Sequence, residues 1–144
     1  MFQANTFITS QQSHATVAGL SNGNFFIAWE GFKYSSELSV FGQFFHPNNS
    51  KIGEEFKINA DSYSGHHPRV SYIDNDKFIV VWRAYGIFGQ IFYNNGTRLG
   101  NEFSIDSNKP NNQANVVVAS LCNGTLLLFG TLLKFMVGFF QISY

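Results

Sequence analysis

The sequence has little charge and almost no cysteine. Lys and Arg number 9, Asp and Glu number 9, and charged residues make up 12% of the chain, about half the usual share. Nucleic-acid-binding surfaces depend on clustered positive charge, so a chain with zero net charge is not expected to bind DNA or RNA. The single cysteine, Cys122, excludes an intrachain disulfide and a zinc site built from cysteines.

Targeting and membrane signals are also scarce. Residues 1–20 lack a basic region followed by an apolar run, so no signal peptide is expected. For a secreted location, this chain would have to be the mature part or a fragment of a longer protein. Residues 126–142 carry one charge, Lys134, and are just long enough for a membrane span. The repeat described below explains them better as core strands, so a membrane partner is not expected.

Aromatic residues, by contrast, are abundant. Phe alone contributes 17 of the 144 residues, and 44% of the chain is hydrophobic. This composition is typical of a folded chain with a packed core and not of a disordered one. The length fits a single domain, residues 1–144.

An internal repeat organises the chain. A Phe-Gly-Gln triplet occurs at residues 41–43 and again at 88–90, and a Gly-x-Glu-Phe motif occurs at 53–56 and at 100–103, in both cases 47 residues later. A third copy begins at residues 113–124, which match 12–23 without a gap, and then degenerates: Gly130 stands where Trp29 and Trp82 would be expected. The predicted units are about 2–55, 56–102 and 103–144.

Each unit is predicted to contain four short strands joined by turns such as Asn22-Gly23, a strong hairpin signal. Residues 25–29 and 78–82 are apolar on both faces, which indicates sheets covered on both sides. Four-stranded antiparallel sheets stacked face to face are the blades of a β-propeller. The predicted fold is therefore all-β, with three such blades, and a β-trefoil is the alternative. The expected strands are 2–5, 16–20, 25–29, 40–45, 56–59, 69–73, 78–82, 87–93, 103–106, 116–121, 126–129 and 136–142.

The second unit carries a family resemblance. Its motifs are His67-Pro68-Arg69-Val70, Phe78 to Trp82, Gly86 to Phe92 and Gly96 to Asp106. The pattern resembles propeller-type blade repeats of large secreted and surface proteins of bacteria and ciliates, often found beside adhesin or cadherin-like modules. The resemblance covers most of residues 2–125 and implies a blade fold, but it implies no particular activity.

Three blades do not close a propeller, which usually has four to eight. Two open sheet faces would remain, and large exposed apolar faces usually mark interfaces. We therefore expect self-association, further repeats in a longer chain, or closure by residues 2–5 acting as a strap on the third unit.

No catalytic, metal or cofactor site is expected. His66 and His67 are adjacent and would point to opposite sides of an extended strand, and His14 and His46 form no pair at ligand spacing. No nucleophile motif is present. Glu54, Glu55 and Glu102 are interpreted as solvated charges at the start of strands.

Three glycosylation sequons occur, at Asn48, Asn95 and Asn123, all in turns predicted to share one end of the sheets. The opposite end remains free for a ligand. Arg83, Tyr85, Glu30 and Tyr34 lie there and are the candidate contacts for a glycan, because aromatic faces and charged hydrogen-bonding groups suit sugar hydroxyls. The sequence thus predicts a non-enzymatic extracellular or cell-surface binding or adhesion module. A self-assembling structural subunit is the alternative, and an enzyme ranks third.

Overall fold

The computed structural model describes residues 1–32, 37–60, 64–74, 76–105, 116–120, 126–130 and 138–140. These residues form strands, turns and extended segments, and they contain no helix of the length and hydropathy needed to cross a bilayer. The strands are β1 (Gln12–Gly19), β2 (Phe25–Gly31), β3 (Ser39–Phe45), β4 (Lys51–Lys57), β5 (His66–Tyr72), β6 (Lys77–Arg83), β7 (Ile87–Tyr93), β8 (Arg98–Ser104), β9 (Val116–Ser120), β10 (Leu126–Gly130) and β11 (Gly138–Phe140).

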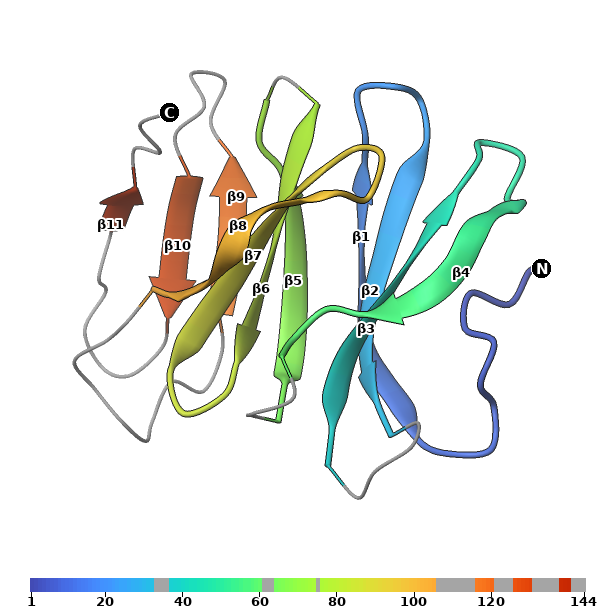
Figure 1. Ribbon diagram of the computed structural model, residues 1–144, viewed down its shortest axis with the longest axis horizontal. Coiled ribbons are helices and arrows are strands. Elements are labelled where there is room, and N and C mark those ends of the chain that lie inside the picture. Colours follow the sequence, from blue (N-terminus) through green and yellow to red (C-terminus); the bar gives the residue numbers. More distant parts are fainter. Residues whose placement is uncertain are drawn as a thin grey trace.

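The strands form three separate antiparallel sheets in the orders β1-β2-β3-β4, β5-β6-β7-β8 and β11-β10-β9. Figure 1 shows the sheets side by side, with β1, β5 and β9 following one another along one edge of the stack. This is the arrangement of propeller blades, in which each sheet begins at the innermost strand. The fold is thus all-β and of the partial propeller type, as the sequence predicted. It is not a β-trefoil, because each sheet is separate and the sheets pack face to face.

The second sheet is covered on both faces. One face packs on the first sheet in a core that contains Phe26 and Phe44 from the first sheet and Phe78, Trp82 and Phe92 from the second. The other face packs towards β9 in a smaller core of aliphatic residues. Double coverage explains why β6 is apolar along its length instead of alternating.

The last strand of each complete sheet differs from the sequence expectation. Residues 56–59 and 103–106 were expected to open new units, but β4 and β8 begin earlier and complete the sheets of the preceding strands. The physical reason is local. A short turn lets a strand pair at once with the strand before it in the chain. The turn between β3 and β4 is of this kind, and in it the Asn49 N–H donates to the His46 carbonyl at 2.9 Å.

Residues 1–11 also differ from expectation. They form no strand and do not close the third sheet; they lie on the outer face of the first sheet, at the far end of the stack from β11 (Figure 1). The Phe2 ring packs against the rings of Phe25 and Phe45, with centroids 6.3 and 5.4 Å away. Thr6 N–H donates to the Glu55 carboxylate at 2.6 Å. The N-terminal segment therefore covers the apolar face against which a preceding blade would otherwise pack.

Candidate binding site at the N-terminal ends of the inner strands

Two histidines occupy equivalent bulges on neighbouring inner strands. In β1 the pairing with β2 shifts between Ser13 and Thr16, and in β5 the pairing with β6 shifts between His66 and Arg69. Within these bulges His14 has φ 53° and His67 has φ 50°, a left-handed conformation that is uncommon outside glycine, although His adopts it more readily than most. Bulges re-aim side chains, and here they bring two imidazoles from different sheets together.

The two imidazoles stack, with ring centroids 4.0 Å apart and planes inclined by 19°. They lie over the carboxylate of Glu30, which is at the end of β2. His14 Nδ1 is 2.7 Å from Glu30 Oε1, and Ser13 Oγ donates to the same oxygen at 3.0 Å. The second carboxylate oxygen accepts the backbone N–H of His67 at 2.6 Å. The cluster thus joins the first sheet to the second.

Glu30 is buried, with 4% of its surface exposed. Burial by itself would raise the pKa of this carboxyl, but the hydrogen bonds from the His67 backbone, the His14 ring and the Ser13 hydroxyl outweigh it, so the pKa is lowered. The group is therefore an ionised acceptor or metal ligand. A general acid would require a raised pKa.

His66 lies next to this cluster and close to Arg83, its partner across the β5–β6 ladder. Burial lowers the pKa of His66; the Glu30 charge opposes that effect, and the Arg83 charge adds to it. The charges of Glu30 and Arg83 therefore act on the pKa of His66 in opposite directions. Its Nε2 lies 3.2 Å from the Ser64 hydroxyl.

The predicted contact residues differ in how far they are exposed. Tyr85 is 68% exposed, in the turn after β6 that the Ala84 N–H to Gly86 carbonyl bond closes at 2.8 Å. Arg83 is half-buried at the end of β6. Glu30 lies beneath the surface, and Tyr34 lies outside the described residues.

The predicted glycosylation sites are at the other end. Asn48 and Asn95 are exposed and lie in the β3–β4 and β7–β8 turns. Because each strand reverses direction, these turns are at the end opposite to Glu30 and Arg83. Asn123 lies outside the described residues.

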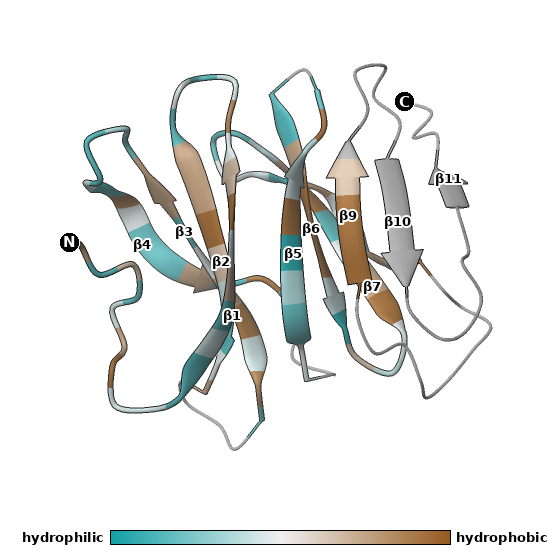
Figure 2. Cartoon of the chain, turned by 180° about the vertical axis from the view of Figure 1, so that it is seen from behind, coloured by the Kyte–Doolittle hydropathy of each residue, from teal (hydrophilic) through white to brown (hydrophobic). Residues whose placement is uncertain are grey.

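Sequence reasoning missed the meeting of His14 and His67. The signal was present, because residues 12–29 align with 65–82 without a gap, which places His14 and His67 at the same position, just before the second predicted strand of each unit. A regular strand would place the neighbouring side chains of His66 and His67 on opposite sides, and only the bulge brings His67 to His14. Figure 2 shows hydrophilic stretches near the lower ends of β1 and β5.

A small hollow of about 120 Å³ adjoins the cluster on the outer face of the first sheet. Its walls are mostly apolar, and they come from the N-terminal segment (Ala4, Asn5) and from the first two strands (Gln12, Ser13, Ala15, Ile27 and Trp29). The hollow is well below the volume of about 300 Å³ or more that is usual for small-molecule pockets.

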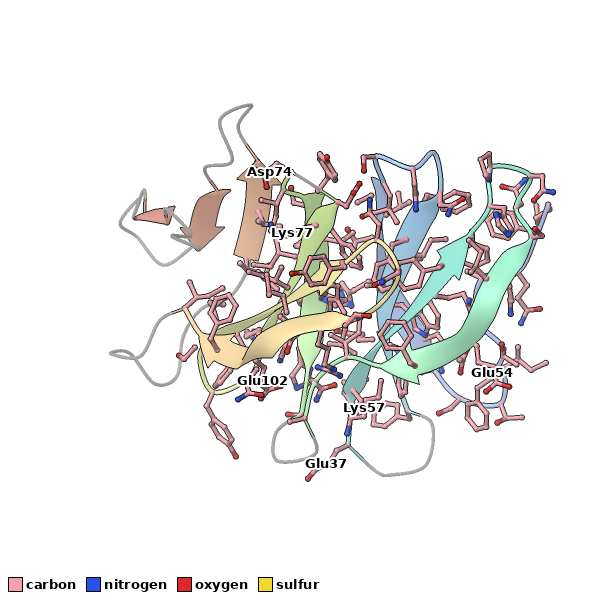
Figure 3. The ribbon with its side chains drawn as sticks, turned by 45° about the horizontal axis from the view of Figure 1, so that its top comes forward. Glu37, Glu54, Lys57, Asp74, Lys77 and Glu102 are labelled. Atoms are coloured by element: carbon pink, nitrogen blue, oxygen red, sulfur yellow. The ribbon has the colours of Figure 1, made fainter. Side chains whose placement is uncertain are left out.

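The other described carboxylates lie outside β2. Figure 3 shows Glu54 on β4 and Glu102 on β8, with Glu37 just before β3 and Asp74 in the turn after β5. Glu55 is next to Glu54 on β4, and Asp76 is in the same turn as Asp74. Glycoside hydrolysis by the usual route uses two carboxyl groups about 5–10 Å apart, one of them with a raised pKa. The cluster around Glu30 supplies one carboxylate, and that one has a lowered pKa.

Comparison with known proteins adds one structural likeness. No protein-family model matches the chain, and no curated protein matches it. Its fold is similar to that of a solved structure, the endo-arabinase from Bacteroides thetaiotaomicron, with a TM-score of 0.61 and 12% sequence identity. The match covers 99% of this chain and 60% of that one, so this chain spans less than two thirds of the enzyme's length. At such low identity the likeness shows a shared fold.

Proposed function

We propose that this chain is a non-enzymatic binding module that recognises carbohydrate at the end of the sheets where Arg83 and Tyr85 lie. The observation that carries the proposal is the exposed Tyr85 ring, two residues from the half-buried Arg83 and at the same end as the Glu30 cluster. An aromatic face and a guanidinium at the same end of the sheets suit the apolar faces and hydroxyl groups of a sugar ring.

A binding role fits this end better than catalysis does. Glu30 has a lowered pKa and three hydrogen bonds, which make it a rigid support for the surface residues. The endo-arabinase of similar fold makes arabinan a reasonable first glycan to test, although it transfers no residue roles to this chain.

We place the module outside the cell or on its surface. Two sequons lie in exposed turns, away from the proposed contact residues, so glycans attached there would leave the binding end accessible. Expression through a secretory pathway, followed by enzymatic deglycosylation and mass measurement, tests whether Asn48 and Asn95 are modified. Unmodified protein at both sites would contradict the glycoprotein part of the proposal.

The experiment for the binding site is titration calorimetry against a panel of soluble polysaccharides that includes arabinan. We expect a double variant, Arg83→Ala with Tyr85→Ala, to lose binding while its melting temperature stays close to that of the wild type. Asn48→Ala with Asn95→Ala is the matched control at the opposite end and should bind normally. Equal loss in both variants, or no binding to any glycan by the wild type, would overturn the proposal.

Self-assembly is the second candidate, and one observation favours it. Val17 of β1 and Val117 of β9 both expose large parts of their side chains along the inner strands. In a closed propeller these strands would line the central channel, so a second copy could cover them. Light scattering separates the two functions: a monomer or defined dimer favours a binding module, whereas open-ended polymers favour a structural subunit.

A further inference from the structure

We propose that His14, Glu30 and His67 form a binding site for a divalent transition metal such as Zn²⁺. One ligand atom from each of these residues lies within 4.8 Å of the other two. The three residues come from β1, β2 and β5, and thus from two different sheets. The inference is independent of the proposed carbohydrate function.

The donor set determines the kind of metal. Two imidazoles and one carboxylate suit borderline first-row metals such as Zn²⁺, whereas Ca²⁺ and Mg²⁺ prefer sites made of oxygen atoms. Three protein ligands leave one position of a tetrahedral site for water or for an external ligand.

Metal binding requires the His14 ring to leave its stack on His67, because a metal lies in the plane of each imidazole that binds it and the two rings are stacked with centroids 4.0 Å apart and planes inclined by 19°. The gap between His14 and Glu30 must also widen. Tetrahedral Zn²⁺ places its ligand atoms about 3.3 Å apart, whereas His14 Nδ1 is 2.7 Å from Glu30 Oε1. The side chain of His14 is 43% exposed, so its ring has room to rotate outward and open this gap. The metal would then replace the hydrogen bond between His14 and Glu30.

The surroundings already orient the carboxylate. Ser13 Oγ and the His67 backbone N–H hold one oxygen each, and such outer partners fix the direction in which a ligating group points. Both histidines also have a left-handed backbone conformation, at equivalent bulges. Local strain of this kind persists only where the surrounding structure supports it, and it is common at binding sites.

The test is titration of the metal-free protein with Zn²⁺ by calorimetry, repeated with Co²⁺, whose visible absorption spectrum reports four-coordinate geometry. We expect one Zn²⁺ per chain, a tetrahedral Co²⁺ spectrum, and a higher melting temperature in the presence of Zn²⁺. His14→Ala and His67→Ala should each lower the affinity more than about tenfold. The histidine variants are the main test, because a change at buried Glu30 also affects folding.

His46→Ala is the matched control, because His46 is exposed in the β3–β4 turn at the other end of the sheets. It should bind Zn²⁺ as the wild type does, and circular dichroism should show that all three variants are folded. The proposal is overturned if the wild type binds no Zn²⁺. It is likewise overturned if His14→Ala and His67→Ala retain full affinity, or if His46→Ala loses as much affinity as they do.

Discussion

Gln43 and Gln90 make the same hydrogen bonds in successive sheets. Gln43 Nε2 donates to the carbonyl groups of Phe44, Ile52 and Gly53 at 3.0, 2.9 and 3.3 Å. Gln90 Nε2 donates to the carbonyl groups 47 positions later, those of Ile91, Leu99 and Gly100, at 3.0, 3.3 and 3.2 Å. The Phe-Gly-Gln repeat of the sequence is therefore also a repeat of structure, in which the two buried amides occupy equivalent positions.

The first prediction concerns these buried amides. Gln43→Ala and Gln90→Ala should each lower the free energy of unfolding by about 2–3 kcal/mol, because the carbonyl groups lose their donor. Urea denaturation measures the loss. Gln90→Ala should cost more, because Gln90 Oε1 also accepts a hydrogen bond from Arg98 at 3.2 Å, whereas Gln43 Oε1 has no hydrogen-bond partner in the described part of the chain. A larger loss at Gln43 would contradict this account.

The second prediction compares two tryptophans at equivalent positions. Trp82 is 1% exposed, in the core between the first two sheets, and Trp82→Ala should cost about 3–5 kcal/mol. Trp29 is 3% exposed, but it faces the N-terminal segment and borders the hollow there. Trp29→Ala should therefore cost less, because the N-terminal segment can move into the space. Equal losses in thermal or urea denaturation would show that residues 1–11 pack as firmly as a sheet.

The third prediction concerns the N-terminal segment itself. Phe2→Ala should lower stability by about 1 kcal/mol, since its ring loses edge contacts with Phe25 and Phe45. Acrylamide should also quench the fluorescence of Trp29 more strongly, which can be measured in a Trp82→Phe background. Ile8→Ala is the matched control, because Ile8 is largely exposed. Unchanged quenching after Phe2→Ala would mean that the segment does not shield the sheet.

The fourth prediction concerns the link between the first two sheets. Arg98 Nη2 on β8 donates to the carbonyl groups of Lys57 and Ile58 at 3.2 and 3.0 Å. Arg98→Lys should lower the unfolding free energy by about 1 kcal/mol, because an ammonium group cannot reproduce the planar guanidinium geometry. Thermal denaturation measures the change. Lys77→Arg on β6, in the turn region at the same end, is the control and should be nearly neutral.

The blade fold could be predicted because its signals are local or periodic. The sequence shows the hairpin turns, the strands that are apolar on both faces, and the 47-residue spacing of Gln43 and Gln90. The strand boundaries were harder, since Phe56 looks like the start of a unit yet belongs to the last strand of the preceding sheet. The position of residues 1–11 could not be predicted, because it depends on an apolar face that exists only after the first sheet has formed.

The cluster around Glu30 was only partly predictable. Glu30 and Arg83 follow equivalent tryptophans, so the sequence assigned both to the correct end of the sheets. The stacking of His14 on His67 depends on two bulges and on the packing of β1 beside β5, neither of which alternating strand geometry reveals.

The N-terminal segment takes the place of a neighbouring sheet beside β1–β4. A sheet added on this side would have to displace the contacts that Phe2 makes with Phe25 and Phe45 and that Thr6 makes with Glu55. In this respect the segment acts like the capping repeat of a solenoid, which shields the apolar surface of the repeat next to it.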